Sequence, residues 1–136
     1  MHVRRILVLL TVVVAAAPAA AQAGAVNLRM RYHDGAGHTR RATLTCDSAG
    51  PRATGYLRHR SAAKLCARAY ALETFLSSPP DRDQACTEIY GGPDTARIRG
   101  NVRGAAVDRA FSRSDGCEIA DWDRAQRLLP RPVGVS

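Results

Sequence analysis

Four cysteines constrain this chain more than any other feature of its sequence. They are Cys46, Cys66, Cys86 and Cys117. An even number of cysteines in a small exported protein predicts two disulfides rather than free thiols. Four cysteines can pair in three ways, and the residues alone leave all three open.

The N-terminal segment predicts export. Residues 1–5 are basic, and residues 6–17 form an apolar run that is too short to span a bilayer comfortably. Small residues follow, so a small-x-small pattern allows cleavage after Ala21, Ala23 or Ala25. We therefore expect a secreted, extracellular protein that does not associate with a membrane once the signal is removed.

The remaining chain predicts one domain. We assign residues 1–25 to the signal peptide and residues 26–136 to a domain long enough for one core and too short for two.

The positive charge is carried almost entirely by arginine. The formal charge is +8, and Lys64 is the single lysine. We interpret the arginines as dispersed over solvent faces of strands and loops, because apolar residues separate them and aromatic residues make up only 5% of the chain, too few for a stacking platform. The arginines concerned are Arg29, Arg31, Arg40, Arg41, Arg52, Arg58, Arg60, Arg97, Arg99, Arg103, Arg109 and Arg113.

Two segments predict antiparallel hairpins. Residues 26–32 and 40–46 alternate apolar and polar residues around a loop with an Asp-Gly step, which is typical of paired strands with one buried face. Residues 95–102 and 105–111 repeat the pattern around a turn at Arg103-Gly104. The glycine-containing stretch 47–60 has no sustained period, which predicts a loop.

Two segments predict helices. Ser61 is a candidate N-cap for a helix over residues 62–76, which an apolar stripe marks and the Ser-Ser-Pro-Pro sequence ends. Residues 118–129 also have apolar residues at helical spacing, with Trp122 as the expected core anchor. We expect Tyr70 and Phe75 to belong to the core or its edge.

Residues His33, Asp34 and His38 are candidate metal ligands or acid-base groups. The two histidines lie across a glycine-bearing turn without a third ligand at a recognisable spacing, so we interpret these residues as exposed turn residues. We therefore expect no metal.

The polar segment 84–93 is the candidate binding element. A disulfide at Cys86 would hold the chain just before the Glu88-Ile89 bond. The β-branched side chains of Thr87 and Ile89 favour the extended backbone that a protease cleft accepts as an added strand. We interpret this segment as a protease-binding loop that is held in its bound shape before binding.

Several stretches together resemble the Streptomyces subtilisin inhibitor family. They are residues 41–46, the helical Cys66, residues 86–90, and residues 110–111 followed by residues 116–118. The match covers nearly the whole expected domain.

The resemblance implies an α+β fold: a single antiparallel sheet of about five strands, with two helices packed on one side, often as a homodimer. It also implies the disulfides Cys46–Cys66 and Cys86–Cys117. Each bridge would close a loop of roughly 20 to 30 residues and contribute about 3 kcal/mol to stability.

By the same resemblance, the attacked bond is Glu88-Ile89, and Glu88 fills the primary specificity pocket of a serine protease. The protease supplies the catalytic serine, so the protein would inhibit by mimicking a substrate, with no catalytic residue, cofactor or metal of its own. The loop residues that would contact the protease are Ala85, Cys86, Thr87 and Tyr90.

The acid at position 88 departs from the family, which usually presents methionine, lysine or another residue suited to subtilisin- or trypsin-like pockets. An unpaired carboxylate is unfavourable in an apolar pocket. The expected partner is therefore an extracellular serine protease, either subtilisin-like or, with a better fit, glutamate-preferring.

Two other classes of function were weighed against the inhibitor. A small basic secreted binding protein for nucleic acid or another anionic partner, without inhibitory activity, is the alternative. For a ribonuclease of this class, His33, His38, His59 and Glu88 would be the conceivable acid-base groups. We expect no nucleic-acid partner, because the cations are dispersed. We also expect no enzyme, because the sequence lacks a Gly-x-Ser-x-Gly, a His-Glu-x-x-His and a phosphate loop.

Overall fold

The computed structural model describes residues 24–133. Residues 1–23 of the expected signal peptide, with its first two candidate cleavage sites, lie outside these residues. Within them, no helix is both long and apolar enough to cross a membrane.

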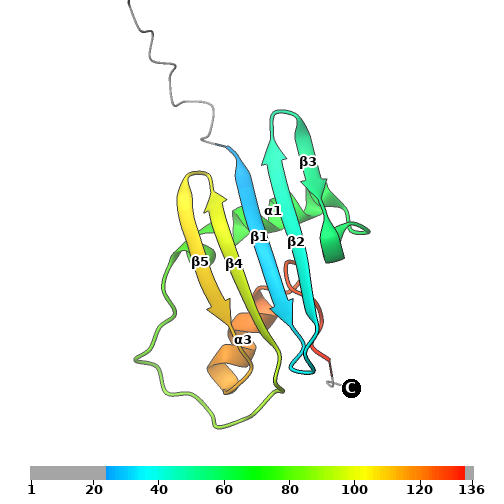
Figure 1. Cartoon of the computed structure of the whole chain (residues 1–136). Helices are drawn as coiled ribbons and strands as arrows, with labels where there is room; N and C mark the ends of the chain where they lie inside the picture. Colours follow the sequence, from blue (N-terminus) through cyan, green and yellow to red (C-terminus); the bar gives the residue numbers. More distant parts are fainter. Residues whose placement is uncertain (1–23, 134–136) are drawn as a thin grey trace, which may run out of the picture.

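The domain is built on one five-stranded antiparallel sheet with the order β3-β2-β1-β4-β5 (Figure 1). The strands are β1 (Val26–His33), β2 (Thr39–Asp47), β3 (Gly50–Ala53), β4 (Thr95–Val102) and β5 (Ala105–Phe111). The helices lie behind the sheet in Figure 1, so one face is covered and the other is open. The α+β fold with a single antiparallel sheet is therefore confirmed.

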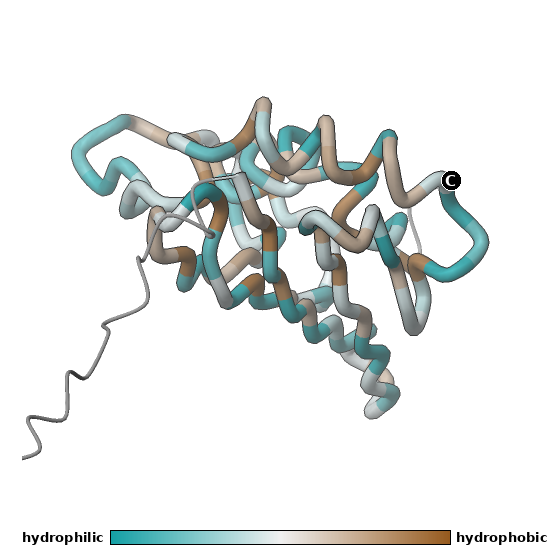
Figure 2. Tube along the Cα trace, turned by 90° about the horizontal axis from the view of Figure 1, so that it is seen from above, coloured by the Kyte–Doolittle hydropathy of each residue, from teal (hydrophilic) through white to brown (hydrophobic). Residues whose placement is uncertain are grey.

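Alternation of side chains decides which face is covered. Along β1 every second residue from Val26 to Tyr32 is buried, and the residues between them are exposed. The register pairs Leu28 with Leu44 of β2, so that the apolar sets of neighbouring strands meet on one face. Figure 2 shows the same alternation of hydrophobic and hydrophilic positions along the trace. Both predicted hairpins are confirmed.

The stretch predicted as a loop, residues 47–60, is partly regular. Strand β3 pairs with the end of β2, and the short helix η2 (Gly55–Leu57) follows it. The prediction was wrong here because β3 is a short edge strand with no buried residue, so it lacks apolar alternation. Gly55 has a φ of +62°, and a Cβ there would lie 1.9 Å from the carbonyl oxygen of Arg41, so this close approach requires glycine.

The first predicted helix, over residues 62–76, is divided into two. Helix α1 (Ala62–Ala71) starts at Ser61, whose hydroxyl accepts a hydrogen bond from the backbone of Lys64 at 3.4 Å, as an N-cap does. Helix α2 (Glu73–Ser77) follows after Leu72, which leaves helical geometry with a φ of −101° and a ψ of 7°. Both segments still bury their apolar side chains, so the stripe predicted the covered face correctly.

The second predicted helix is shorter than expected. Helix α3 (Gly116–Arg124) ends before Ala125, although the prediction extended to Leu129. Leu128 and Leu129 are fully buried without being helical, and Arg127 adopts a φ of +80°. The apolar spacing therefore reported burial in the core rather than helical structure. Trp122 is fully buried and anchors α3, as predicted.

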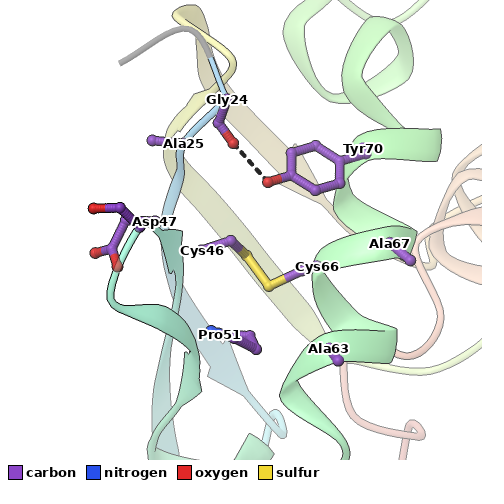
Figure 3. A pocket seen from close by; sticks show the side chains of 10 residues that line it. Gly24, Ala25, Cys46, Asp47, Pro51, Ala63, Cys66, Ala67 and Tyr70 are labelled. Carbon is purple, nitrogen blue, oxygen red and sulfur yellow. Dashed lines mark hydrogen bonds between the residues drawn. A yellow bond between two sulfur atoms is a disulfide. The ribbon is translucent and has the colours of Figure 1, made fainter. Parts of the chain in front are cut away.

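The two disulfides pair Cys46 with Cys66 and Cys86 with Cys117, which confirms the pairing implied by the resemblance. The first bridge joins β2 to α1 inside the core (Figure 3). Beside it, the hydroxyl of Tyr70 donates a hydrogen bond to the carbonyl oxygen of Gly24 at 2.6 Å. The start of the described chain is thus fastened to α1.

Two of the arginines that we expected on the surface are buried. Arg109 is 5% exposed and Arg113 is 6% exposed. The prediction was wrong for this pair because their guanidinium groups hydrogen bond to backbone carbonyls at the two ends of the connection between α2 and β4.

Candidate functional site

The candidate site is the long connection between α2 and β4. Residues 81–90 are all exposed and belong to no helix or strand. Ile89 is 59% exposed and Tyr90 is 68% exposed, which are high values for large hydrophobic side chains. The predicted contact residues 85–90 therefore stand together in solvent at one edge of the molecule (Figure 1).

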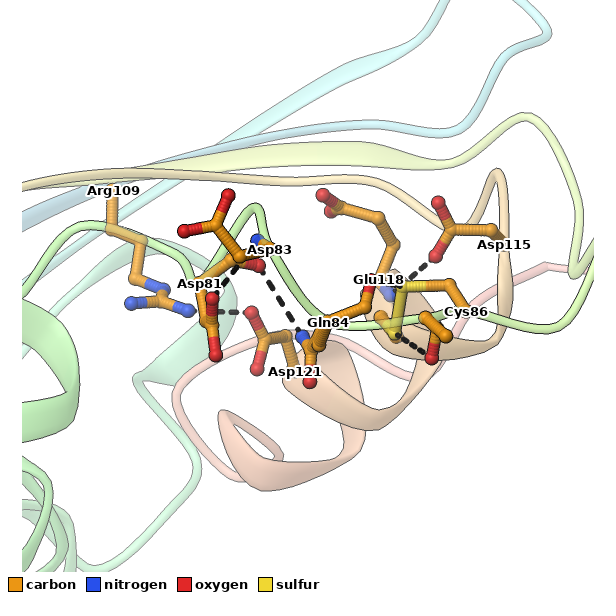
Figure 4. Close-up of a disulfide and its surroundings, with 10 residues drawn as sticks. Asp81, Asp83, Gln84, Cys86, Arg109, Asp115, Glu118 and Asp121 are labelled. Atoms are coloured by element: carbon orange, nitrogen blue, oxygen red, sulfur yellow. Dashed lines mark hydrogen bonds and ion pairs between the residues drawn. A yellow bond between two sulfur atoms is a disulfide. The ribbon is translucent and has the colours of Figure 1, made fainter.

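A disulfide connects this loop to the start of α3. Cys86 in the loop is bonded to Cys117 in the first turn of the helix (Figure 4). The helix start is itself fixed, because the Asp115 carboxylate accepts a hydrogen bond from the backbone of Glu118 at 2.9 Å. The loop is thus tied to a capped helix terminus.

Two backbone hydrogen bonds hold the loop on both sides of the predicted reactive bond. The backbone N–H of Gly116 donates to the carbonyl oxygen of Thr87 at 2.9 Å, and the N–H of Gly91 donates to the carbonyl oxygen of Arg113 at 2.7 Å. Between these anchors, residues 88–90 make no hydrogen bond to any other described residue. The exposed residues 88–90 are therefore flanked on both sides by backbone that is hydrogen bonded to residues 113–116.

The close approach at these anchors requires glycine. A Cβ at Gly116 would lie 2.0 Å from the Oγ1 atom of Thr87. A Cβ at Gly91 would lie 2.8 Å from the Cδ1 atom of Ile119 and 3.1 Å from the Nε atom of Arg113. An added side chain at either position would force the side chain that it meets, Thr87 or Ile119, to move.

The buried Arg113 reinforces the second anchor. Its Nε atom donates a hydrogen bond to the carbonyl oxygen of Gly91 at 2.9 Å, so that Gly91 and Arg113 are linked in both directions. The guanidinium group also lies 5.9 Å from the centre of the Trp122 ring and 3.8 Å from a carboxylate oxygen of Asp123. These contacts connect the loop to the core.

The buried Arg109 fixes the chain where it leaves α2. Its Nη1 atom donates hydrogen bonds to the carbonyl oxygens of Phe75 and Ser78, both at 2.8 Å. Its Nη2 atom is paired with the carboxylate of Asp121 in α3 (Figure 4). Arg109 therefore joins the end of α2 to α3 at the beginning of the loop.

The buried Asp94 fixes the other end of the loop. Its carboxylate accepts hydrogen bonds from the hydroxyl of Tyr32 and from the backbone of Val133, the latter at 3.2 Å. Burial, followed by the hydrogen bond to Asp94, raises the pKa of Tyr32 far above its usual range. The phenol consequently stays protonated and remains a donor to the carboxylate.

The predicted site residues lie together in one exposed loop, and the sequence identified one of its supports, the disulfide at Cys86, but not the buried side chains at its ends. Arg109 and Arg113 occupy inward positions in and just after β5, and this alternation was the available signal. Asp94 could not have been identified, because its partners lie far away in the sequence.

The side chains of His33, Asp34 and His38 form hydrogen bonds within the β1–β2 hairpin. The Asp34 carboxylate accepts hydrogen bonds from the backbones of Ala36 and His38 and lies 2.6 Å from Nδ1 of His38, while His33 is hydrogen bonded to Thr39. Burial alone would raise the pKa of Asp34, but these hydrogen bonds outweigh it and lower the pKa.

Residues 24–133 bring three potential metal ligands within reach of one ion at a single place, formed by Cys86, Asp115 and Cys117. Both sulfur atoms are already joined in the disulfide, so they are not thiolate ligands. The conceivable acid-base set of a ribonuclease is not assembled by hydrogen bonds: in the described chain none connects His33, His38, His59 or Glu88 to another of the four.

No family model and no curated protein matches this chain. What the site can do must therefore be argued from its geometry. The site presents one exposed peptide segment, and both of its flanks are bonded to residues 113–117.

Proposed function

We propose that the protein is a substrate-like inhibitor of an extracellular serine protease, with Glu88-Ile89 as its reactive bond. One observation carries the proposal: Cys86 and Thr87 before the bond, and Gly91 after it, are all tied to residues 113–117, while the residues between them are free to enter a cleft. The resemblance to the Streptomyces subtilisin inhibitor family supports the same bond.

In this proposal the protease performs the chemistry. Its serine attacks the carbonyl carbon of Glu88, and the amino group of Ile89 is the leaving group. After cleavage, the new carboxyl end stays fastened through Thr87 and Cys86, and the new amino end stays fastened through Gly91. The two ends remain adjacent, so the bond can reform before the fragments escape.

Preorganisation accounts for affinity. A flexible peptide must lose conformational entropy when it is ordered in a cleft, at roughly 0.5–1.5 kcal/mol for each immobilised side chain. Here the backbone on both sides of the bond is already fixed in the free protein. Binding therefore orders little more than the exposed residues 88–90.

The side chain at position 88 indicates the class of protease. Glu88 would enter the specificity pocket as an anion, and an apolar pocket would leave that charge unpaired. A glutamate-preferring serine protease offers a cationic or hydrogen-bonding partner. We therefore propose this class as the target ahead of subtilisin-like enzymes.

The disulfide makes the test specific. The protein should inhibit a glutamate-preferring protease. In a mixture quenched with acid, part of the protein should be heavier than the parent by one water molecule, because the bond is hydrolysed while the disulfide keeps both fragments together. Reduction should then separate two fragments that end at Glu88 and begin at Ile89, because Cys86 and Cys117 lie on opposite sides of the cut. Cleavage at many sites without inhibition would contradict the proposal.

Secretion and homodimer formation also remain proposals. Two disulfides and the absence of a membrane-spanning helix among residues 24–133 are compatible with an extracellular protein. Mass spectrometry of protein from the culture medium tests export, and sedimentation tests for a dimer. A basic binding protein without inhibitory activity is the alternative, and one surface of the sheet supports an anionic partner.

A further inference from the structure

The open face of the sheet gathers five arginines that are scattered in the sequence. Arg31 of β1 lies between Arg41 of β2 and Arg97 of β4, and in the next row Arg29 lies opposite Arg99. All five side chains are exposed. Figure 1 is seen from this side, with the helices behind it. We call this surface the arginine face. It corrects our expectation that the cations are dispersed.

Asp108 partly neutralises the arginine face, and Glu118 is a second acid in the lining of the depression over it. Asp108 of β5 accepts hydrogen bonds from Arg97 at 2.6 and 2.9 Å and from Arg99 at 3.2 Å. These hydrogen bonds, those from Arg97 first, lower the pKa of Asp108 to about 2, so it remains charged. Within residues 24–133, Arg29, Arg31 and Arg41 form no ion pair.

The register places arginines directly opposite one another on neighbouring strands. Neighbouring strands lie about 4.8 Å apart, and like charges directly opposite one another destabilise a sheet. The screening length at physiological ionic strength is about 8 Å, so salt does not separate these charges fully. The row formed by Arg41, Arg31 and Arg97 therefore favours a partner that brings dense negative charge. A second copy of the same face would add repulsion.

The chemistry of the face selects among anions. Every cation on it is an arginine, whose planar fork of donors fits phosphate oxygens in pairs. No Phe, Tyr or Trp side chain points outward from the four long strands, so the face lacks the aromatic platform on which successive nucleic-acid bases stack. The other outward residues are Asn27, His33, Thr39, Thr43, Thr45, Asp47, Thr95, Asn101, Ala106 and Ala110, and of these the one acid, Asp47, is paired with Arg52 at 2.7 Å.

We propose that the arginine face binds a linear, base-free phosphate polymer. A depression covers the face, and its rim includes Pro80 and Arg82 at the start of the long loop. None of residues 84–93 lines this depression. The polymer can therefore occupy the sheet while Glu88-Ile89 stays accessible, and this inference does not depend on the proposed inhibition.

The test measures binding of end-labelled inorganic polyphosphate by fluorescence anisotropy over a series of salt concentrations. The triple substitution Arg29→Gln, Arg31→Gln and Arg41→Gln removes charges that form no ion pair in the described chain. Each lost phosphate contact should reduce the magnitude of the slope of log affinity against log salt by about 0.7. The slope of the triple variant should therefore be smaller by about two, and its affinity should be at least tenfold lower than that of the parent. Thermal unfolding verifies that it is folded.

A matched control removes the same charge elsewhere. Arg58, Arg127 and Arg131 are exposed and do not line the depression. Replacing all three by glutamine should leave the polyphosphate affinity within about threefold of the parent value, because charges far from the face are largely screened at physiological ionic strength.

Several outcomes would overturn the inference. One is an equal loss of affinity in the control, which would show that only net charge matters. Tighter binding of duplex DNA, or of a sulfated polysaccharide, than of polyphosphate would reject the assigned chemistry. Sedimentation that finds a dimer in the parent and a monomer in the face variant would assign the surface to a second copy.

Discussion

At the scale of single residues, the side chain at position 88 should determine which protease is inhibited. A charged group that enters a buried pocket changes affinity according to the partner that the pocket offers. Glu88→Lys should confer inhibition of trypsin, whose pocket carries an acid, and Glu88→Met should strengthen inhibition of subtilisin. Both should weaken inhibition of a glutamate-preferring protease. Each change should reach at least tenfold, which corresponds to about 1.4 kcal/mol.

The measurement is an inhibition constant for the parent and both variants against all three proteases. Glu88 is exposed in the free protein, so the substitutions should not alter thermal stability. Constants that do not change across the series would show that residue 88 lies outside the specificity pocket, even if the protein proves to be an inhibitor.

Gly116 is the second residue with a clear expected effect. Its Cβ would lie 2.0 Å from Oγ1 of Thr87, so Gly116→Ala should force the Thr87 side chain beside the proposed reactive bond to move and should raise the inhibition constant at least about tenfold. Alanine is favoured over glycine in a helix by up to about 1 kcal/mol, so the start of α3 should not be weakened. The melting temperature should therefore stay close to that of the parent.

Ser48→Ala is the control, because Ser48 is exposed in the turn between β2 and β3 and does not belong to the loop. It should inhibit like the parent. If Gly116→Ala inhibited equally well, the contact with Thr87 would not be needed to hold the reactive bond.

At the scale of elements, the two disulfides should have separable roles. Cys86→Ser with Cys117→Ser releases the exposed loop but leaves the core bridge, so inhibition should weaken more than stability. Cys46→Ser with Cys66→Ser affects two buried residues and should reduce the free energy of unfolding by about 3 kcal/mol. Inhibition constants and urea unfolding of both double variants check this.

The loop-released variant should also become a substrate that the protease digests. A variant without this bridge that inhibits as tightly as the parent and stays uncleaved would show that the backbone anchors at Thr87 and Gly91 suffice without it.

Much of this architecture could be predicted from the sequence, because alternation reports burial directly. The strands containing Leu28, Leu44 and Ile98 were identified in this way. Strand β3 was missed because it buries no residue, and α3 was extended too far because Leu128 and Leu129 are buried without being helical.

The loop that carries Glu88 was identified by its polar, turn-bounded sequence and its cysteine. The arginine face was missed because it depends on strand order: Arg41, Arg31 and Arg97 become neighbours only when β1 lies between β2 and β4. The buried supports Asp94, Arg109 and Arg113 likewise depend on contacts between distant segments.

At the scale of the whole molecule, the buried Tyr32 and the partly buried Tyr56 should limit stability at alkaline pH. The hydroxyl of Tyr32 bonds to Asp94, and that of Tyr56 donates to the carbonyl oxygen of Leu128 at 2.9 Å. Burial is the main reason that both pKa values lie well above the ordinary value of 10.0. The folded state therefore prefers the neutral phenol in both cases.

The sign of the effect follows from this preference. A group whose pKa is raised by folding contributes its full stabilisation below the pKa of the unfolded state, and that contribution is lost as pH rises toward the pKa of the folded state. The free energy of unfolding should thus be nearly constant up to the usual tyrosine range. Above that range, the ionisation of each of the two tyrosines should lower the free energy of unfolding by up to about 1.4 kcal/mol for each pH unit.

Urea unfolding at a series of pH values, from neutral to strongly alkaline, measures this slope. Tyr32→Phe should remove about half of it, even though the variant is less stable at every pH because Asp94 loses a donor. Tyr90→Phe is the matched control, since Tyr90 is 68% exposed and should leave the slope unchanged. A parent whose stability does not fall in the alkaline range, or a Tyr32→Phe variant with the parental slope, would mean that the Tyr32–Asp94 pair does not hold its proton in the folded state. The fixed end of the reactive loop would then need another explanation.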